Sequence, residues 1–219
     1  MQEVYRFLEE LRKNNNREWF NANKEWYLAV KAEHEAFINR LIPALAKVDP
    51  EVDGLTAKDC IFRIYRDVRF SPNKEPYKTH IGAYMVKGGK KSPRSGYYVH
   101  VEPGNSLLAG GIWCPEPSLL KALRKDVYDN IDEFTGIIRD KEFQKYYALD
   151  GEKLKTVPAP FPKDFPEGEL LKYKSYTIEN KVPDSFFEGE DAIERIVKRL
   201  LVMQPFHRFL NYTVEETWG

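Results

Sequence analysis

The sequence predicts an α+β fold, in which an antiparallel meander of about residues 60–113 packs against N- and C-terminal helices. Apolar residues recur at helical spacing before and after this segment. Within it, short runs rich in β-branched and aromatic residues are separated by turn residues. These turns are short, whereas parallel neighbours need long crossovers, so the strands should be antiparallel.

The composition indicates one ordered globule. The 219 residues suffice for a sizeable core, and 42% of them are hydrophobic and 14% aromatic. We therefore expect a single domain over residues 1–219. Along the chain it should have a helical part at 1–48, a sheet part at 59–113 and a helical and irregular part at 117–219.

Two helices are predicted in the N-terminal part. The first follows from apolar residues at positions 4, 7, 8 and 11, and it should stop at three consecutive asparagines, 14–16. Asn16 is suited to cap the next helix, because its side chain can accept a hydrogen bond from the first turn. That helix carries apolar residues from Trp19 to Leu45. Pro43 should kink it or end it early, since proline lacks the backbone N–H.

Four strands are predicted in the middle of the chain. Each is a short run of β-branched and aromatic residues, and the runs are CIFRIYR (60–66), IGAYMVK (81–87), GYYVHVE (96–102) and NSLLAGGIW (105–113). A turn-rich segment and a Pro-Gly pair separate the last three. Within NSLLAGGIW, two adjacent glycines favour a bulge over a ligand-binding close approach.

Helical spacing returns at about residue 117. The segment 156–168 contains four prolines and should be an irregular extended loop. The run YKSYTIEN (173–180) predicts a last strand. A final helix follows from the apolar spacing of residues 193–200, and Pro205 should interrupt it.

The chain is neutral overall, with 34 Lys and Arg against 34 Asp and Glu, but its charge is unevenly spread. Residues 63–94 contain nine basic and two acidic residues. A protein that coats nucleic acid usually carries excess positive charge over its whole domain. Neutrality therefore disfavours a nucleic-acid partner, which stays open as an alternative. A local positive field suits a compact anion better.

Several classes of protein are disfavoured. No apolar run approaches the ~20 residues of a membrane-spanning helix, and the amphipathic, acidic start of the chain is unlike a signal peptide. We expect a cytoplasmic protein without a membrane partner. Cys60 and Cys114 are far apart and no Cys-x-x-Cys occurs, which disfavours a disulfide framework or a cysteine zinc site. We predict no cofactor.

The stretch RIYRDVRFSPNKEPYKTH, residues 63–80, concentrates cations beside aromatic residues. Arginine and lysine are the usual partners of phosphate or carboxylate oxygens, and tyrosine rings can flank a base or sugar. We therefore expect a small phosphorylated or carboxylated ligand to be bound by Arg63, Arg66, Arg69, Lys74, Tyr77, Lys78 and His80. At least one arginine should face an open pocket with Tyr65 or Tyr77 in its wall, because Asp67 can hardly satisfy three guanidinium groups.

The alternative is internal pairing, in which Asp67 and Glu75 each hold an arginine and the other cations are solvated. Asp67 is also a weak candidate for catalysis, together with His80 and His100. A catalytic carboxylic acid needs a raised pKa, however, and the arginines on either side of Asp67 favour its charged form. We therefore expect Asp67 to orient arginines.

His100 and Glu102 are candidate metal ligands. These two residues should share one face of a strand, and His80 could supply a third ligand. This spacing is common by chance, and a half-buried, hydrogen-bonded histidine is the simpler interpretation. We predict no metal site.

Five stretches together resemble the conserved hypothetical family called domain of unknown function 2461. They are NNNREWFNANKEWY, FRIYRDVRFSPNKEPYKTHIGA, KSPRSGYYVHVEPG, GGIWCPEP and LLKYKSY, which span nearly the whole chain. The resemblance implies one intact domain from a family without an established activity. It supplies no catalytic residues, so function must be argued from the residues themselves.

Three functions are compatible with the sequence, which does not assign the chain as an enzyme or as a non-enzyme. The first and favoured one is a module that binds a small anionic ligand through residues 63–80. The second is a hydrolase or transferase acting on such a ligand, with His80 or His100 as acid or base. The third is a protein whose basic loop docks on an acidic partner or nucleic acid.

Overall fold

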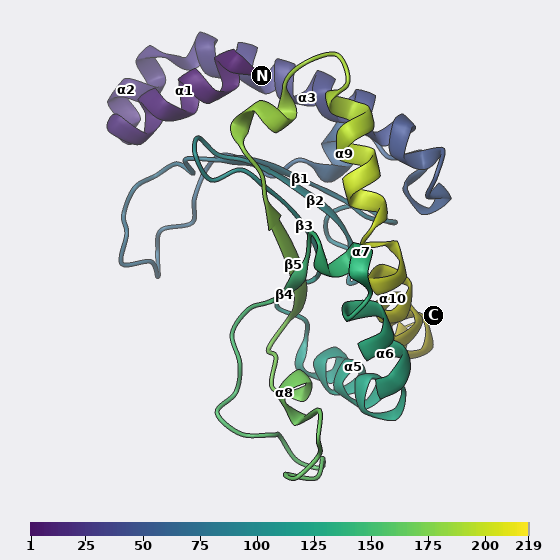
Figure 1. The fold of residues 1–219 in the computed structure, drawn as a ribbon. Coiled ribbons are helices and arrows are strands. Elements are labelled where there is room, and N and C mark those ends of the chain that lie inside the picture. Colours follow the sequence, from purple (N-terminus) through teal and green to yellow (C-terminus); the bar gives the residue numbers. More distant parts are fainter. Residues whose placement is uncertain (219) are drawn as a thin grey trace. The chain divides into compact units, whose positions relative to one another are not determined.

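The computed structural model describes residues 1–218 (Figure 1). Its α-helices are α1 Gln2–Lys13, α2 Arg17–Ala22, α3 Lys24–Ala46, α4 Ala57–Cys60, α5 Pro117–Asp129, α6 Ile131–Ile138, α7 Lys141–Gln144, α8 Gly168–Leu171, α9 Ala192–Leu201 and α10 Gln204–Trp218. Its strands are β1 Ile81–Met85, β2 Gly96–Val101, β3 Leu107–Ile112, β4 Ala148–Asp150 and β5 Tyr176–Lys181. Short 3₁₀ turns lie at Pro50–Val52 and Asp184–Phe187.

The strands form one five-stranded antiparallel sheet in the order β1-β2-β3-β5-β4. The α+β class and the antiparallel sheet are thus confirmed. The sheet also extends beyond the predicted 60–113 segment, because β5, predicted at 173–180, adds to β3. The three-residue β4 was missed; it pairs with β5, with Leu149 opposite Ile178.

Contacts between residues divide the chain into two compact units. Unit 1 comprises residues 1–90, 98–108 and 181–198, and unit 2 comprises residues 91–97, 109–180 and 199–219. The predicted basic stretch lies wholly in unit 1. The single domain expected from the sequence stays a prediction.

The predicted strand over residues 60–66 is wrong. Cys60 instead ends the helical turn α4, which is fixed by a capping box between Thr56 and Asp59. The residues that follow lie along β1 and the segment before it, but they pair only at isolated bridges, Ile61 with Ala83 and Tyr65 with Tyr77. Prolines within 71–76 cannot donate to a ladder, which limits pairing there.

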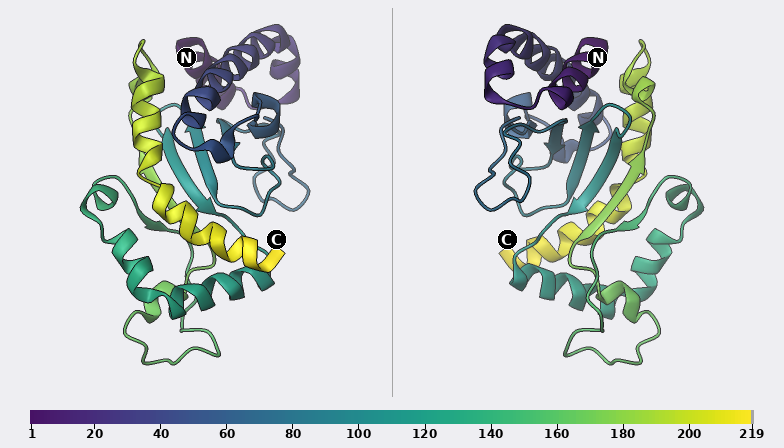
Figure 2. Two further views of the ribbon diagram at one scale, coloured as in Figure 1. Left: turned by 90° about the vertical axis from the view of Figure 1, so that its right-hand side faces the viewer. Right: turned by 90° about the vertical axis from the view of Figure 1, so that its left-hand side faces the viewer.

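The N-terminal helices follow the prediction with one difference. Asn16 caps α2 by accepting a hydrogen bond from the backbone N–H of Trp19 at 2.9 Å. The predicted second helix is two helices, because the chain leaves helical geometry at Asn23 between α2 and α3. Pro43 lies inside α3, which continues to Ala46. Figure 2 shows α1 beside α3, where Leu8 and Leu41 are fully buried.

The C-terminal part also follows the prediction. Helices α5 and α6 occupy the segment after residue 117, and the proline-rich segment is irregular until α8 begins at Gly168. The final helical segment is broken into α9 and α10 just before Pro205. Within residues 1–218, no helix has both the length and the apolar character needed to cross a bilayer.

Gly110 and Gly111 on β3 are required by close packing within unit 2. A Cβ atom on Gly110 would overlap the ring of His207 on α10. Gly111 has a φ of +112°, and a Cβ there would overlap the carbonyl oxygen of Tyr176 and lie 2.8 Å from the Cα of Thr177 on β5. The atoms that come close to these two glycines thus belong to the protein itself, to α10 and β5.

We predict that Gly111→Ala destabilises the protein by about 2 kcal/mol or more, because it adds both backbone strain and steric overlap. Gly136→Ala is the matched control. Gly136 lies in α6 with open space around it, so alanine should be neutral or stabilising by up to about 1 kcal/mol. Urea unfolding midpoints measure both effects, and equal midpoints for the two variants would contradict the packing argument.

His34 on α3 is a buried histidine whose Nε2 has no hydrogen-bond partner among residues 1–218. Burial lowers its pKa to about 4, from an ordinary value near 6.5. The unfolded chain therefore binds a proton at His34 more readily than the folded chain between these pH values. The resulting stability is fully present above pH 6.5 and is lost as the pH falls towards 4.

We predict that His34→Leu flattens this pH dependence. Wild-type protein should lose about 1 kcal/mol at His34 between pH 7.5 and pH 5.5, a range largely above carboxylate titration. The leucine variant should lack that part of the decline. Urea unfolding at the two pH values gives the difference, and identical slopes for wild type and variant would show that His34 does not cause it.

Candidate functional site

The basic stretch folds as an irregular two-stranded ribbon in unit 1. The backbone N–H of Lys78 donates to Ile64 at 2.8 Å, and that of Arg66 donates to Pro76 at 2.9 Å. The bridge between Tyr65 and Tyr77 lies between these two bonds. Residues 67–75 form the loop that closes the ribbon.

Three cations of the ribbon and its loop make hydrogen bonds within it. Arg69 donates two side-chain hydrogen bonds to Asp67, at 2.9 and 2.6 Å. Arg66 donates to the carbonyl oxygen of Glu75 at 3.1 Å and to the Ser71 hydroxyl at 3.3 Å. Lys74 donates to the carbonyl oxygen of residue 68 at 3.0 Å. Internal pairing therefore accounts for three of the seven predicted ligand-binding residues.

Asp67 lies at the exposed end of the ribbon. Hydrogen bonds from the side chain and the backbone N–H of Arg69 lower the pKa of its carboxyl group. A carboxylate held in its charged form is a poor proton donor. The geometry thus fits the expected orienting role of Asp67 better than a catalytic one.

Tyr77 is buried rather than facing a pocket. Its ring stacks on that of Phe20 with 3.9 Å between centroids, and its backbone exchanges two hydrogen bonds with the side-chain amide of Asn15. The Tyr65 ring packs beside both aromatic rings and is 43% exposed. Tyr77 therefore joins the ribbon to α2 through Phe20, which is buried in the core.

Arg63 and Lys78 differ from the other cations. Neither side chain makes a hydrogen bond or an ion pair with any residue in 1–218; Lys78 is half-buried, with its ammonium 5.5 Å from the centre of the Phe62 ring. Burial lowers the pKa of Lys78, and repulsion from the nearby Arg63 lowers it further. These two cations thus repel each other, and neither has an ion-pair partner within the described residues, although Arg63 attracts the Asp67 carboxylate at longer range.

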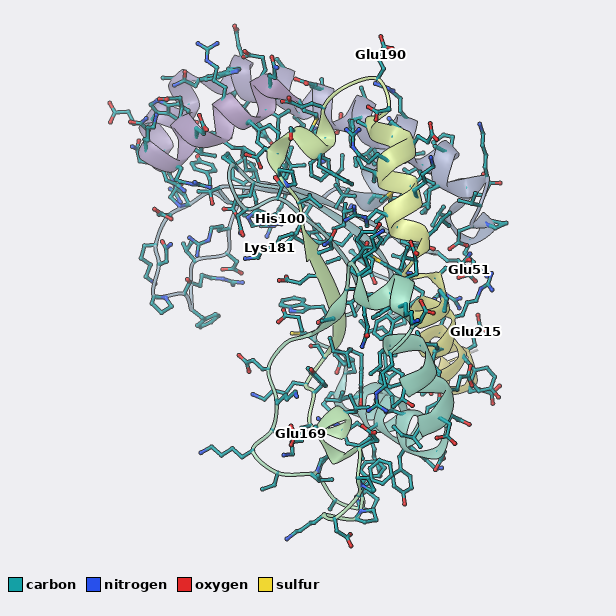
Figure 3. The ribbon with its side chains drawn as sticks, viewed as in Figure 1. Glu51, His100, Glu169, Lys181, Glu190 and Glu215 are labelled. Carbon is teal, nitrogen blue, oxygen red and sulfur yellow. The ribbon has the colours of Figure 1, made fainter. Side chains whose placement is uncertain are left out.

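Next to them lies a cluster of His80, His100 and Glu102, which come from two neighbouring parts of the sheet. Strand β2 places Tyr98 and His100 on one face, as its alternation predicts, and Glu102 follows directly after the strand. His80 precedes β1, the neighbouring strand. The rings of His80 and His100 stack with 4.3 Å between centroids. Nitrogen atoms of both histidines and an oxygen of Glu102 lie within 4.8 Å of one another. Figure 3 marks His100 among the side chains of unit 1.

Glu102 is held by hydrogen bonds from several elements of unit 1. Its Oε1 accepts from the Thr79 hydroxyl at 2.9 Å and from Arg12 of α1 at 3.4 Å. Its Oε2 accepts from Asn105 at 2.8 Å and lies 3.3 Å from Nε2 of His100. Burial alone would raise the pKa of Glu102, but the hydrogen bonds outweigh it and hold the pKa below its ordinary value.

Both histidines of the cluster are neutral at physiological pH. Burial lowers the pKa of His80 to about 4, with repulsion from His100 and the nearby cations Lys78 and Arg66 adding to the effect. Burial also lowers the pKa of His100, although Glu102 opposes this shift. A neutral imidazole carries one nitrogen lone pair that can accept a proton or bind a metal.

Tyr98 orients His100 from the other side of the ring. Its hydroxyl lies 3.0 Å from Nδ1 of His100, and burial raises the pKa of Tyr98 to about 12. Gly82 on β1 makes room for this tyrosine, because a Cβ there would overlap the hydroxyl and lie 2.8 Å from the ring carbon Cζ. The alternation of β2 indicates the face of Tyr98. Nothing in the sequence pattern indicates that Gly82, Thr79, Asn105 and Arg12 support the same cluster.

A separate surface pocket of about 480 Å³ lies in unit 2. It is formed by α5 and the proline-rich loop, and its lining residues include Tyr128, Phe161 and Lys125. None of the predicted site residues contributes to this pocket. This pocket is therefore different from the predicted one, which should have Tyr65 or Tyr77 in its wall.

Comparison with known proteins identifies the family. A family model described as "Conserved hypothetical protein (DUF2461)" matches residues 3–209 of the chain. The chain belongs to the DUF2461 family. Searches among curated proteins and solved structures found no significant match. The resemblance seen in the sequence is thereby confirmed, and the function of this DUF2461 domain rests on its own geometry.

We predict that Gly82→Ala in this DUF2461 domain lowers the melting temperature, because the added methyl group must displace Tyr98. Tyr98→Phe removes the hydroxyl, which is the atom that the methyl group would overlap most closely. The two changes should therefore be less destabilising together than the sum of the single effects. Melting temperatures of the four proteins complete the double-mutant cycle, and strictly additive shifts would refute the proposed contact.

Proposed function

We propose that this domain binds a small phosphorylated or carboxylated ligand at Arg63 and Lys78, beside His80. The observation that carries the proposal is the pair of adjacent cations without an ion-pair partner in residues 1–218. The other predicted cations, Arg66, Arg69 and Lys74, support the ribbon that presents this pair.

The electrostatics of Lys78 support an anionic ligand. A half-buried ammonium next to a guanidinium is unfavourable, as the lowered pKa of Lys78 indicates. An anion between the two groups would replace repulsion by two charge-assisted hydrogen bonds. Arginine supplies a planar fork and lysine a point charge, a combination suited to phosphate or carboxylate oxygens.

The distribution of charge favours a small ligand over nucleic acid. The chain is neutral as a whole, and much of its local positive charge is already paired inside the loop. A long polyanion gains most of its affinity from many phosphate contacts along an extended basic surface. Two unpaired cations side by side suit one anionic group instead.

We predict that phosphate, sulfate or a nucleotide raises the melting temperature of the wild-type domain in a thermal-shift screen. Arg63→Met and Lys78→Met should abolish this stabilisation. Without ligand, Arg63→Met should melt at or above the wild-type temperature, because the repulsion on Lys78 is removed.

Arg69→Met is the matched control for this screen. Arg69 is an exposed arginine of the same ribbon, but it is paired with Asp67. This variant should keep the anion response. The proposal fails if no anion stabilises wild type, or if Arg69→Met loses the response as completely as Lys78→Met.

A second candidate function is a hydrolase or transferase that acts on the same ligand. The chain of hydrogen-bonding groups from Tyr98 through His100 to Glu102 favours it, because a neutral histidine oriented by a carboxylate is a common general base. His80, stacked on His100, is the other candidate for acid or base. Loss of turnover in His100→Asn, with anion binding retained, would distinguish catalysis from binding once a substrate is found.

We also propose that the domain works in the cytoplasm. The two cysteines, Cys60 and Cys114, are free thiols, and this supports a reducing compartment. Cys60 is buried, and burial raises its pKa to about 11, which makes it unreactive.

A further inference from the structure

We propose that His80, His100 and Glu102 form a binding site for one divalent transition-metal ion of the zinc type. The proposal goes beyond anion binding and does not rest on it. From the sequence alone, chance spacing and a hydrogen-bonded histidine were the simpler interpretation of these three residues. The structure favours the metal site instead, because it brings His80, which is distant in the sequence, next to His100 and Glu102.

The spacing of the ligand atoms supports the site. Two ligands that lie about 2.0–2.2 Å from a zinc ion at a tetrahedral angle are roughly 3.3–3.6 Å apart. Nε2 of His100 and Oε2 of Glu102 lie 3.3 Å apart, within this range. All three ligand atoms lie within 4.8 Å of one another, so the widest gap has to close by at most about 1 Å on binding. Because His100 and Glu102 already lie at ligand spacing, the half-buried His80 is the side chain that must move.

The surrounding hydrogen bonds fix two of the three ligands. Metal-binding histidines usually hydrogen-bond through the nitrogen that does not bind the metal, and metal-binding carboxylates are themselves hydrogen-bonded. Here Tyr98 contacts Nδ1 of His100 and leaves Nε2 directed at Glu102. Thr79 and Asn105 each donate to one oxygen of Glu102. The cluster thus has the outer support that a metal site needs.

Tyr98 is suited to both the free and the metal-bound state. Without a metal, Nε2 of His100 can donate its proton to Glu102 while Nδ1 accepts from the tyrosine hydroxyl. With a metal on Nε2, the ring proton must be on Nδ1. The oxygen of the same hydroxyl can then accept a hydrogen bond from Nδ1–H. A hydroxyl serves both tautomers because it is donor and acceptor. Phenylalanine at this position would serve neither.

His80 has no other evident role in the fold. It stacks on His100 but makes no hydrogen bond with any residue in the described range 1–218. A histidine retained only for packing has no need of a free ring nitrogen beside a second imidazole and a carboxylate. A bound metal would use that nitrogen.

The ligand set indicates the class of metal. Two imidazoles and one carboxylate suit Zn²⁺, Co²⁺, Ni²⁺ or Fe²⁺, whereas Mg²⁺ and Ca²⁺ prefer oxygen ligands only. Three protein ligands leave at least one position for water or an anion.

The test uses the full chain, freed of metal by dialysis against a chelator. Isothermal titration with Zn²⁺ should show one saturable site per chain, and Co²⁺ should give a visible spectrum that Zn²⁺ displaces. Mg²⁺ should bind at least tenfold more weakly than Zn²⁺. His80→Asn and Glu102→Gln should each weaken Zn²⁺ binding at least tenfold, and Tyr98→Phe should weaken it by about tenfold.

His34→Leu is the control, because it removes a histidine of unit 1 outside the cluster and should leave Zn²⁺ affinity unchanged. Circular dichroism must show that each variant is folded without metal. If Glu102→Gln unfolds, His80→Asn still tests the site, because the His80 side chain makes no hydrogen bond within residues 1–218 and its loss should leave the fold intact. The proposal is overturned if wild type binds no Zn²⁺, or if folded His80→Asn binds it with wild-type affinity.

The two proposals fail separately. Arg63→Met should lose the anion response and retain Zn²⁺ binding. The anion response of metal-free wild type, measured in metal-free buffer after the chelator has been removed, tests the anion proposal alone. Zn²⁺ binding without an anion response would support the metal site and contradict the anion site. An anion response without Zn²⁺ binding would contradict the metal site.

Discussion

The candidate site depends on the hydrogen bonds that the carboxylate of Glu102 accepts. This carboxylate accepts hydrogen bonds from Arg12 on α1, from Thr79 before β1 and from Asn105 after β2, and it lies next to His100. A carboxylate taken out of water needs such donors, because an unpaired buried charge costs several kcal/mol. One side chain therefore ties a helix, a loop and a turn of unit 1 to the same point.

This arrangement explains why His80 and His100 can stack. Two imidazoles in contact would repel each other if both were protonated, and their lowered pKa values keep them neutral. Glu102 pulls the pKa of each histidine upwards, but burial has the larger effect. The cluster thus combines one negative group with two neutral bases.

Sequence patterns predicted the parts of the fold that are set locally. The cap at Asn16, the first helix and the alternation of β2 depend on residues close together in the chain. The split at Asn23 and the continuation of α3 through Pro43 were missed, since packing of the flanking residues decides whether a helix survives a weak position. The strand at 60–66 failed because the capping box at Thr56 and Asp59 carries the helical turn up to Cys60.

The site could be predicted only in part, for the same reason. Arg69 and Asp67 pair two residues apart, so the sequence allowed their pairing to be considered beforehand. The predicted meander already placed the strands beside His80 and His100 next to each other, so His80 could be named as a third ligand. Whether the two rings touch depends on the register of those strands, which the spacing of residues does not encode. Lys78 and Arg63 are recognisable as cations from the sequence. That neither has an ion-pair partner within residues 1–218 can be known only from the three-dimensional positions of the acidic residues.

The packing of Gly82 against Tyr98 has an evolutionary consequence. The tyrosine occupies the space that a side chain on the adjacent strand would need, so the two positions are not independent. A relative with a larger residue at position 82 would have to give up the aromatic ring at 98 or move it away. Natural variation at these two sites should therefore be correlated. Chains that have lost the glycine should also have lost the tyrosine contact to the histidine.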